Sequence, residues 1–319
     1  MSYLISKQSN MLSKFRLFSF YLAAVVIVFS LLGLFTNGLN LALDFTGGYL
    51  TEFSTEKSIK HNEMEALLAS YLPDSFKLTA ADNGTYWSVQ QADNDVSLKG
   101  KAWLTDFAQQ SGLSIAPQDA IYIGSQVGEE LINQGGLALL TSMIVILLYL
   151  SFRFEWRLAA GSVIALFHDV IIVLGIFAWF DIPFDLTILA SLLAIIGYSL
   201  NDSIIVGDKI REIMKRKASG QNTNNAEHDE TLGDIDSMIN LAIKSTFVRT
   251  LITSGTTLAT IMAIWFFAGE SLAGFAIALF SGVLVGTLSS IAISATVPQM
   301  LGLTADFYNK KEQELCQLP

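Results

Sequence analysis

Six long apolar segments constrain the fold of this chain more than any other feature. Each is close to the roughly 20 residues that an α-helix needs to cross the hydrocarbon core of a membrane. A segment in lipid must satisfy its backbone hydrogen bonds internally, so each is predicted to be a helix. The six predicted transmembrane helices are residues 15–36, 136–154, 157–180, 184–206, 247–267 and 272–298. The composition agrees, since 15% of the residues are charged, compared with about 25% in ordinary soluble domains.

Basic residues beside these segments predict the orientation, because short cytoplasmic loops collect Lys and Arg. All the basic groups fall on one side of the predicted helices: Lys7, Lys14 and Arg16; Arg153 and Arg157; Lys209, Arg211, Lys215, Arg216 and Lys217; Lys310 and Lys311. Residues 1–14, 207–246 and 299–319 are therefore predicted to be cytoplasmic, both termini included. Residues 37–131 are expected on the opposite, periplasmic side.

Residues 37–131 have the periodicity of a small soluble domain. Strand and helix patterns occur in the order β-α-β-β-α-β, and Asn83 with Gly84 forms a hairpin signal. The predicted strands are 49–53, 76–79, 85–89 and 120–123, and the predicted helices are 58–72 and 95–110. This order is typical of a ferredoxin-like α+β sandwich. We therefore predict an α-helical membrane protein with six transmembrane helices and one periplasmic ferredoxin-like α+β domain between the first two.

The periplasmic domain carries no signature of catalysis. No His/Cys cluster, Gly-rich phosphate loop or nucleophile motif occurs in it, so no enzyme activity, metal site or cofactor is predicted. Its excess of carboxylates over lysines argues against a nucleic-acid partner. A binding or docking role is the simplest interpretation.

Two charges of opposite sign lie in the apolar segments. A charge in lipid costs roughly 2.5–3.5 kcal/mol even on lenient scales, so Asp202 and Arg249 predict a function that handles ions. Tyr198 and Asn201 share a helical face with Asp202, together with Ala194, Gly197 and Ile205. We expect this face to point into the helix bundle.

The fifth apolar segment continues this pattern. From Arg249, helical spacing selects Thr253, Thr256, Thr257 and Thr260, a hydroxyl stripe headed by the arginine. Such a stripe can line an ion path. Alternatively, the threonines bond back to carbonyls of their own helix, which is common in membrane helices.

His168 and Asp169 are adjacent near the middle of the third segment. A His-Asp pair there could relay protons, because imidazole titrates near neutrality. Alternatively, Asp169 only orients a neighbouring helix by hydrogen bonding.

Small residues recur every fourth position in the sixth segment. Gly274, Ala278, Gly282, Gly286 and Ser290 form this ridge. Small ridges allow helix backbones to approach closely, so the pattern predicts helix packing.

Five motifs in order resemble the SecF branch of the SecD/SecF family, within the resistance-nodulation-division superfamily. They are LALDFTGG (41–48), FRFEWRLAAG (152–161), ALFHDV (165–170), IGYSLNDSIIV (196–206) and RTLITSGTTL (249–258). Ala42 stands where Gly is usual, Gly207 where a larger residue is expected, and the polar stretch 221–230 looks long for the family. These departures indicate a divergent paralogue and touch none of the proposed charges.

The resemblance implies a multi-pass protein of the bacterial inner membrane that pairs with a SecD homologue and contacts membrane lipid. It implies association with the SecYEG channel and use of an ion gradient to help export an unfolded preprotein from the periplasmic side. In the family, the aspartate of the SLND motif and the arginine of the RTL motif are the functional charges, which are Asp202 and Arg249 here. Asp169 is the next candidate.

The main hypothesis is that a proton or a cation at Asp202 weakens its attraction to Arg249 and so moves the periplasmic domain. Hydroxyl and amide oxygens near Asp202 suit a proton or a sodium ion, and the choice stays open. Three alternatives remain: half of a lipid or small-molecule exporter, an intramembrane aspartyl protease built on Asp169 and Asp202, and a fixed Asp202–Arg249 ion pair that only joins two helices.

Overall fold

A computed structural model describes residues 2–72, 76–81, 84–91, 101–218, 235–268 and 272–304, without the side chains of residues 2–11 and Ser125. Six of its helices are long and apolar enough to cross a membrane, which confirms the predicted number. They are α1 (Ser2–Thr36), α5 (Ser125–Arg153), α6 (Trp156–Trp179), α7 (Leu186–Ala218), α9 (Ile235–Phe267) and α10 (Ala273–Ala292). A short helix, α11 (Thr296–Met300), follows α10. The chain is therefore a multi-pass membrane protein.

Several helices extend beyond the predicted apolar segments. Helix α7 continues past residue 206 and α9 begins well before residue 247, so the described parts of the predicted loop 207–246 are helical. Charged pairs one turn apart, Lys209–Glu212 and Arg211–Asp208, stabilise the extension of α7. Helix α5 begins at Ser125, so the predicted domain boundary at 131 lies inside it. The predicted polar stretch 221–230 and residues 305–319 of the tail lie outside the described residues.

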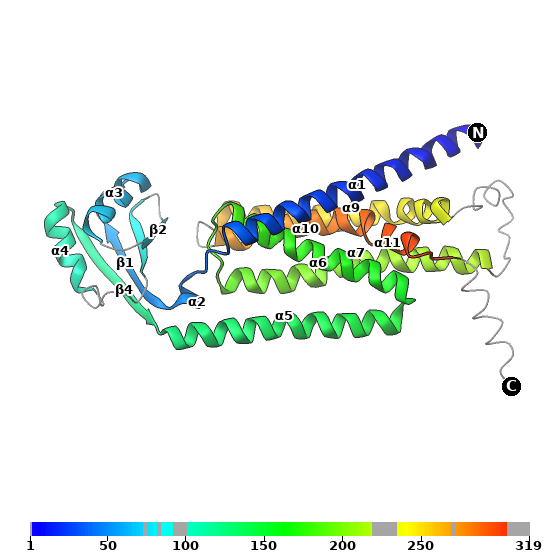
Figure 1. The fold of residues 1–319 in the computed structure, drawn as a ribbon. Helices are drawn as coiled ribbons and strands as arrows, with labels where there is room; N and C mark the ends of the chain where they lie inside the picture. The colour runs from blue at the N-terminus through cyan, green and yellow to red at the C-terminus, as the bar shows by residue number, and fades with distance from the viewer. Residues whose placement is uncertain are drawn as a thin grey trace.

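The domain between α1 and α5 has the predicted ferredoxin-like fold (Figure 1). Its sheet has the order β2-β3-β1-β4, and every neighbouring pair is antiparallel. The elements are β1 (Gly48–Thr55), α3 (His61–Tyr71), β2 (Phe76–Ala81), β3 (Tyr86–Gln91), α4 (Ala102–Ser111) and β4 (Ile115–Ile123). Residues 95–100 of the predicted second helix and Asn83 of the predicted turn lie outside the described residues. Gly84 has a φ of +82°, the left-handed conformation that favours glycine in tight turns.

Alternation along the strands places one set of side chains under the two domain helices. Phe53, Trp87 and Val89 from the sheet are fully buried against α3 and α4. The helices contribute Met64, Leu68, Trp103, Leu104 and Phe107 to this core. The domain therefore has its own hydrophobic core, separate from the helix bundle.

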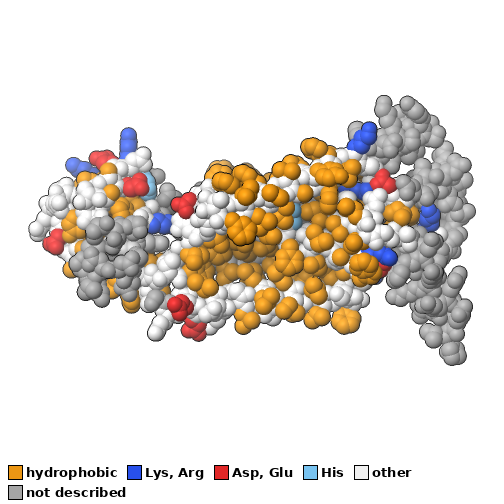
Figure 2. Space-filling model, in the orientation of Figure 1, with side chains coloured by type: hydrophobic (Ala, Val, Ile, Leu, Met, Phe, Trp, Pro, Cys, Tyr) orange, Lys and Arg blue, Asp and Glu red, His pale blue; other side chains and the backbone are white. Residues whose placement is uncertain are grey.

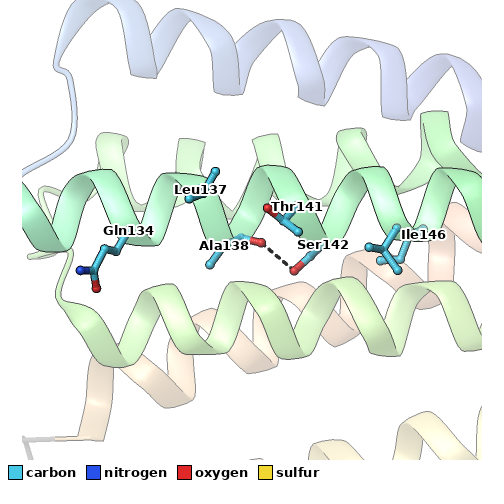
Figure 3. A pocket seen from close by; sticks show the side chains of 7 residues that line it. Gln134, Leu137, Ala138, Thr141, Ser142 and Ile146 are labelled. Atoms are coloured by element: carbon cyan, nitrogen blue, oxygen red, sulfur yellow. Dashed lines mark hydrogen bonds between the residues drawn. The ribbon is translucent and has the colours of Figure 1, made fainter.

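In the bundle, α10 packs against α6, α7 and α9, whereas the backbone of α5 lies farther from the other membrane helices and contacts them through side chains such as Leu139, Met143 and Leu150 (Figure 1). An open hollow runs along α5, lined by Gln134, Leu137, Ala138, Thr141, Ser142, Val145 and Ile146 (Figure 3). Apolar side chains cover much of the bundle surface, and the basic side chains in view lie on the domain and at the opposite end of the bundle, not along its apolar middle (Figure 2).

Arg16 fastens α1 to the bundle at that far end. Its side chain is 4% exposed. It donates to the carboxylate of Asp236 and the amide oxygen of Asn240, both on α9, and to the amide oxygen of Gln299 of α11. A residue predicted only as a cytoplasmic flanking charge is thus the centre of a buried polar network.

Candidate ion-coupling site

Asp202 lies at the middle of α7 and is completely buried. Neither of its carboxylate oxygens has a hydrogen-bond partner among the described residues. The hydroxyls of Ser203 and Thr250 are also buried without such a partner. A buried carboxylate without a partner is unfavourable as a bare anion, so this position favours binding of a proton or a cation.

A chain of hydroxyl groups runs beside Asp202 and joins three helices. Tyr198 of α7 donates to Ser254 of α9 at 3.2 Å, and Ser254 shares a 2.7 Å hydrogen bond with Thr287 of α10. The Ser254 hydroxyl also lies beside the Asp202 carboxylate, but the geometry between the two falls outside that of an ordinary hydrogen bond.

Arg249 does not pair with Asp202 in this chain. It lies near the middle of α9, because the helix begins at Ile235 and not at Phe247, and its side chain is exposed. None of the ion pairs among the described residues joins it to Asp202. The guanidinium acts on the carboxylate only through longer-range electrostatics. Asp202 and Arg249 therefore do not form a fixed ion pair in this structure.

The predicted polar face of α7 does not point toward the other helices of this chain. Gly197, Asn201 and Ala194 are exposed, Tyr198 and Ile205 are half-buried, and only Asp202 is fully enclosed. Helical spacing identified the shared face correctly but could not tell which side faces other helices of the same chain. Small and polar side chains are compatible with either side.

The threonines of α9 bond within their own helix. Thr253 donates to the Arg249 carbonyl at 3.0 Å, Thr256 to the Ile252 carbonyl at 3.0 Å, and Thr257 to the Thr253 carbonyl at 2.9 Å. Thr256 is exposed, and Thr253 and Thr257 are half-buried. These bonds agree with the alternative interpretation, in which the threonines donate to backbone carbonyls of their own helix.

Asp169 is the centre of a satisfied polar cluster. One carboxylate oxygen pairs with His168 Nδ1 at 3.0 Å, and the other accepts from Ser199 of α7 at 2.5 Å and Ser289 of α10 at 2.8 Å. Asp169 is completely buried, whereas His168 Nε2 has no partner among the described residues. These contacts tie α6 to both α7 and α10, as expected if Asp169 orients neighbouring helices.

The small ridge of α10 lies against α7. A Cβ on Gly282 would come within 2.4 Å of Ile195 Cδ1, and one on Gly286 would come within 3.2 Å of Ser199 Cβ. Gly274 faces Ile188 in the same way, with a closest approach of 3.2 Å. The ridge therefore sets the spacing between the helices that carry Asp202 and Ser289.

Sequence reasoning missed four hydroxyl residues around the two aspartates: Ser199, Ser254, Thr287 and Ser289. A signal for Ser254 was present, because Thr246, Thr250 and Ser254 recur every fourth residue and are all buried. This inward stripe is rotated from the outward threonine stripe on α9. Ser199 and Ser289 had no such signal, since each meets Asp169 from another helix.

The chain is similar to known proteins along most of its length. The family described as protein export membrane protein SecD/SecF, C-terminal, matches residues 104–304, and the SecD/SecF GG motif matches residues 32–59. The protein translocase subunit SecF of Pseudomonas aeruginosa is 38% identical over 291 residues, which is 90% of each chain. The chain belongs to the SecF family. The SecF of Vibrio alginolyticus is 40% identical over 89% of this chain and 87% of its own.

Two solved SecDF structures share the fold. The crystal structure of SecDF from Thermus thermophilus, a translocon-associated membrane protein, aligns with a TM-score of 0.72 and 29% identity over 89% of this chain. SecDF in a super-membrane-facing form aligns with a TM-score of 0.63 over 94% of this chain. The present chain spans 38% and 39% of those SecDF chains. It is therefore a Sec translocase subunit, and its relatives are named for transport and not for catalysis.

Proposed function

We propose that this chain is one subunit of an ion-gradient-driven SecD/SecF complex that assists SecYEG-dependent export of preproteins from the periplasmic side of the bacterial inner membrane. The observation that carries the proposal is Asp202, a fully buried carboxylate without a hydrogen-bond partner among the described residues, in the middle of a membrane helix. Such a group changes its charge or its ligand when an ion arrives, and its helix must repack around the difference.

The energy available is sufficient for a mechanical cycle. One elementary charge that crosses 100 mV supplies about 2.3 kcal/mol, which can bias a two-state bundle by more than tenfold. In the proposed cycle, a proton or a sodium ion neutralises Asp202 and weakens its attraction to Arg249. Helix α7 then shifts against α9 and α10, and the periplasmic domain moves with it.

The proposed partner is a SecD homologue, and two observations support it. The chain spans only 38% of the SecDF chain whose fold it shares. Arg249 on α9 and the small face of α7 at Gly197 and Asn201 are exposed on this single chain.

Basic residues at the end away from the domain support cytoplasmic termini, with the domain in the periplasm.

The direct test is Asp202→Asn in the complete SecD/SecF complex. The amide has nearly the same shape but cannot release a proton or balance a cation, so ion flux and export stimulation should both be lost while the complex still assembles. Asp208→Asn is the matched control, because this carboxylate lies on the same helix but pairs with Arg153 and Arg211 near the far end. Normal export with Asp202→Asn would contradict the proposal.

The coupling ion requires a separate measurement. Ion flux in vesicles that contain the complex should be followed while pH and sodium concentration are varied independently. A proton-coupled site responds to the pH gradient without sodium, whereas a sodium site needs sodium at constant pH. The hydroxyls of Tyr198, Ser254 and Thr287 could assist either ion.

The alternative of a lipid or small-molecule exporter has no specific observation in its favour. The one four-stranded periplasmic domain is small for a substrate tunnel. Crosslinking of a stalled preprotein to this domain would support the export function, and transport of a lipid by the purified complex would support the alternative.

A further inference from the structure

A short helix at the base of the periplasmic domain is bonded to the start of α7. This helix, α2 (Leu43–Thr46), lies in the LALDFTGG motif that follows α1. The Leu186 N–H, at the first residue of α7, donates to Asp44 Oδ2 at 3.1 Å. Just before it, the Ala42 N–H donates to the Phe184 carbonyl at 2.8 Å, and the Phe184 N–H to the Asn40 carbonyl at 2.7 Å. Residues at the start of the domain and residues of the α6–α7 loop thus form one small hydrogen-bonded unit.

Apolar packing on both sides of α2 also stabilises this unit. Leu43 and Phe45 of α2 are 7% and 5% exposed, and the Phe45 ring stacks on Phe184 with centroids 5.8 Å apart. On the other side, α5 approaches so closely that a Cβ on Gly128 would lie 2.4 Å from the Phe45 carbonyl oxygen. Helix α2 is therefore held between the beginnings of α5 and α7.

The same unit continues directly into the sheet of the domain. Gly47 and Gly48 have φ of +71° and +136°, and a Cβ on Gly48 would lie 2.1 Å from the Gln91 carbonyl oxygen. Gly48 begins β1, an inner strand of the sheet, and pairs with Ile123 at the end of β4, which leads into α5. Both connections between domain and membrane therefore leave the sheet side by side.

The sheet itself carries a positive charge near the same loop. Burial lowers the pKa of Lys77 on β2, and the nearby carboxylates of Asp185 and Asp181 in the α6–α7 loop oppose this shift. The loop therefore attracts the domain electrostatically as well as through Asp44.

We propose that Asp44 is a positioning residue that transmits displacement of α7 to the periplasmic domain, through the Asp44–Leu186 hydrogen bond, α2 and β1. The proposal rests on the proposed function, in which ion binding at Asp202 moves α7. Asp202 and Leu186 lie on one continuous helix and are 16 residues apart, or about 24 Å at 1.5 Å per residue. A continuous helix carries a shift at Asp202 to its first residue, and Asp44 is the side chain of the domain segment that holds that residue.

The contact is a hydrogen bond from a backbone N–H, so the acceptor oxygen matters more than the charge. Asp44→Ala removes the acceptor, whereas Asp44→Asn retains one. If Asp44 instead belonged to an ion path, Asp44→Ala and Asp44→Asn should both lose function, because both variants lose the charge. Glu129→Ala is the matched control, since Glu129 is an exposed carboxylate near the start of α5, at the same end of the bundle.

The test uses the complete SecD/SecF complex in vesicles, with ion flux, export stimulation and domain movement measured on the same preparations. Movement is the change in distance between spin labels at Phe35, near the end of α1, and Gln110, on α4, when an ion gradient is imposed. Asp44→Ala should keep ion flux within a factor of about two but lose the distance change and lower export stimulation by about tenfold, which corresponds to roughly 1.4 kcal/mol of coupling. Asp44→Asn and Glu129→Ala should behave like the unmodified complex.

A redox pair tests the same contact by restoring it. Asp44→Cys with Leu186→Cys, in a chain whose Cys316 is replaced by Ser, lacks the acceptor when reduced and has a covalent link when oxidised. Export stimulation should be low under reducing conditions and recover on oxidation, while Asp44→Cys alone stays low under both. If Asp44→Ala fails to assemble, the test rests on this double variant, by comparing its export stimulation before and after oxidation.

Three outcomes would overturn the inference: normal domain movement with Asp44→Ala, equal loss of ion flux in Asp44→Ala and Asp202→Asn, or no recovery of export once oxidation has formed the disulfide between positions 44 and 186. Failure of the proposed function is visible separately. In that case Asp202→Asn would retain ion flux and export whatever the Asp44 variants do.

Discussion

Two buried aspartates on adjacent helices have opposite surroundings. Asp169 accepts hydrogen bonds from Ser199 and Ser289 and pairs with His168, whereas neither oxygen of Asp202 has a partner among the described residues. The satisfied carboxylate is suited to holding α6, α7 and α10 together. The unsatisfied one is suited to change its charge or ligand.

This contrast predicts different effects of mutation. Asp169→Ala should destabilise the protein by about 1–3 kcal/mol, because the buried Ser199 hydroxyl loses its acceptor, whereas Ser289 can still donate to the Gly286 carbonyl. Thermal unfolding of the purified protein in detergent measures this loss. Asp202→Ala should leave stability unchanged or higher, since it removes a buried group that has no partner among the described residues.

Ser142→Ala is the control for Asp169→Ala, because Ser142 on α5 is half-buried and its hydroxyl donates, in an exposed hydrogen bond, to the Ala138 carbonyl of its own helix. It should not change the unfolding temperature. A stable Asp169→Asn protein that has lost ion flux would show instead that Asp169 relays protons.

At the scale of helices and strands, sequence periodicity predicted the order of the elements but not which face of each helix packs against other helices. The six helices and the β-α-β-β-α-β order follow from local patterns of apolar residues, and turn glycines such as Gly84 mark the connections. The direction of the Gly197 and Asn201 face does not follow, because it depends on which helices lie beside α7. The partners of Asp169 were missed for the same reason, since Ser199 and Ser289 belong to helices distant in sequence.

The glycine ridge of α10 allows a sharp test of helix packing. Gly282→Ala should destabilise the protein by about 1–3 kcal/mol, because its Cβ would lie 2.4–2.9 Å from three side-chain atoms of Ile195. Adding Ile195→Val removes the nearest of these atoms, Cδ1, and should recover part of the loss. Thermal unfolding in detergent provides the measurement.

Gly136→Ala on α5 is the matched control, because a Cβ there would meet nothing within 4 Å. It should leave stability unchanged or raise it by up to about 1 kcal/mol through helix propensity. Equal stability of Gly282→Ala and the unmodified protein would mean that α7 and α10 are not closely packed.

At the scale of the whole molecule, this chain presents a polar surface that lipid would not cover well. Arg249 is exposed at the middle of α9, and a lipid-facing arginine costs at least about 2.5 kcal/mol. Gly197, which would meet nothing within 4 Å if it carried a Cβ, lies on an exposed face of α7. An exposed charge on α9 and exposed small residues on α7 favour a closely packed protein helix over lipid.

Helices of the SecD homologue should therefore cover this surface in the membrane. Single cysteines at Gly197 and Asn201 should form crosslinks to SecD in intact cells, in chains whose Cys316 is replaced by Ser. A cysteine at Ile164 is the control, because this exposed apolar residue on α6 is suited to lipid and should form none. Crosslinks from Ile164 but from neither α7 position would place SecD on another side of the bundle and leave Arg249 without its expected cover.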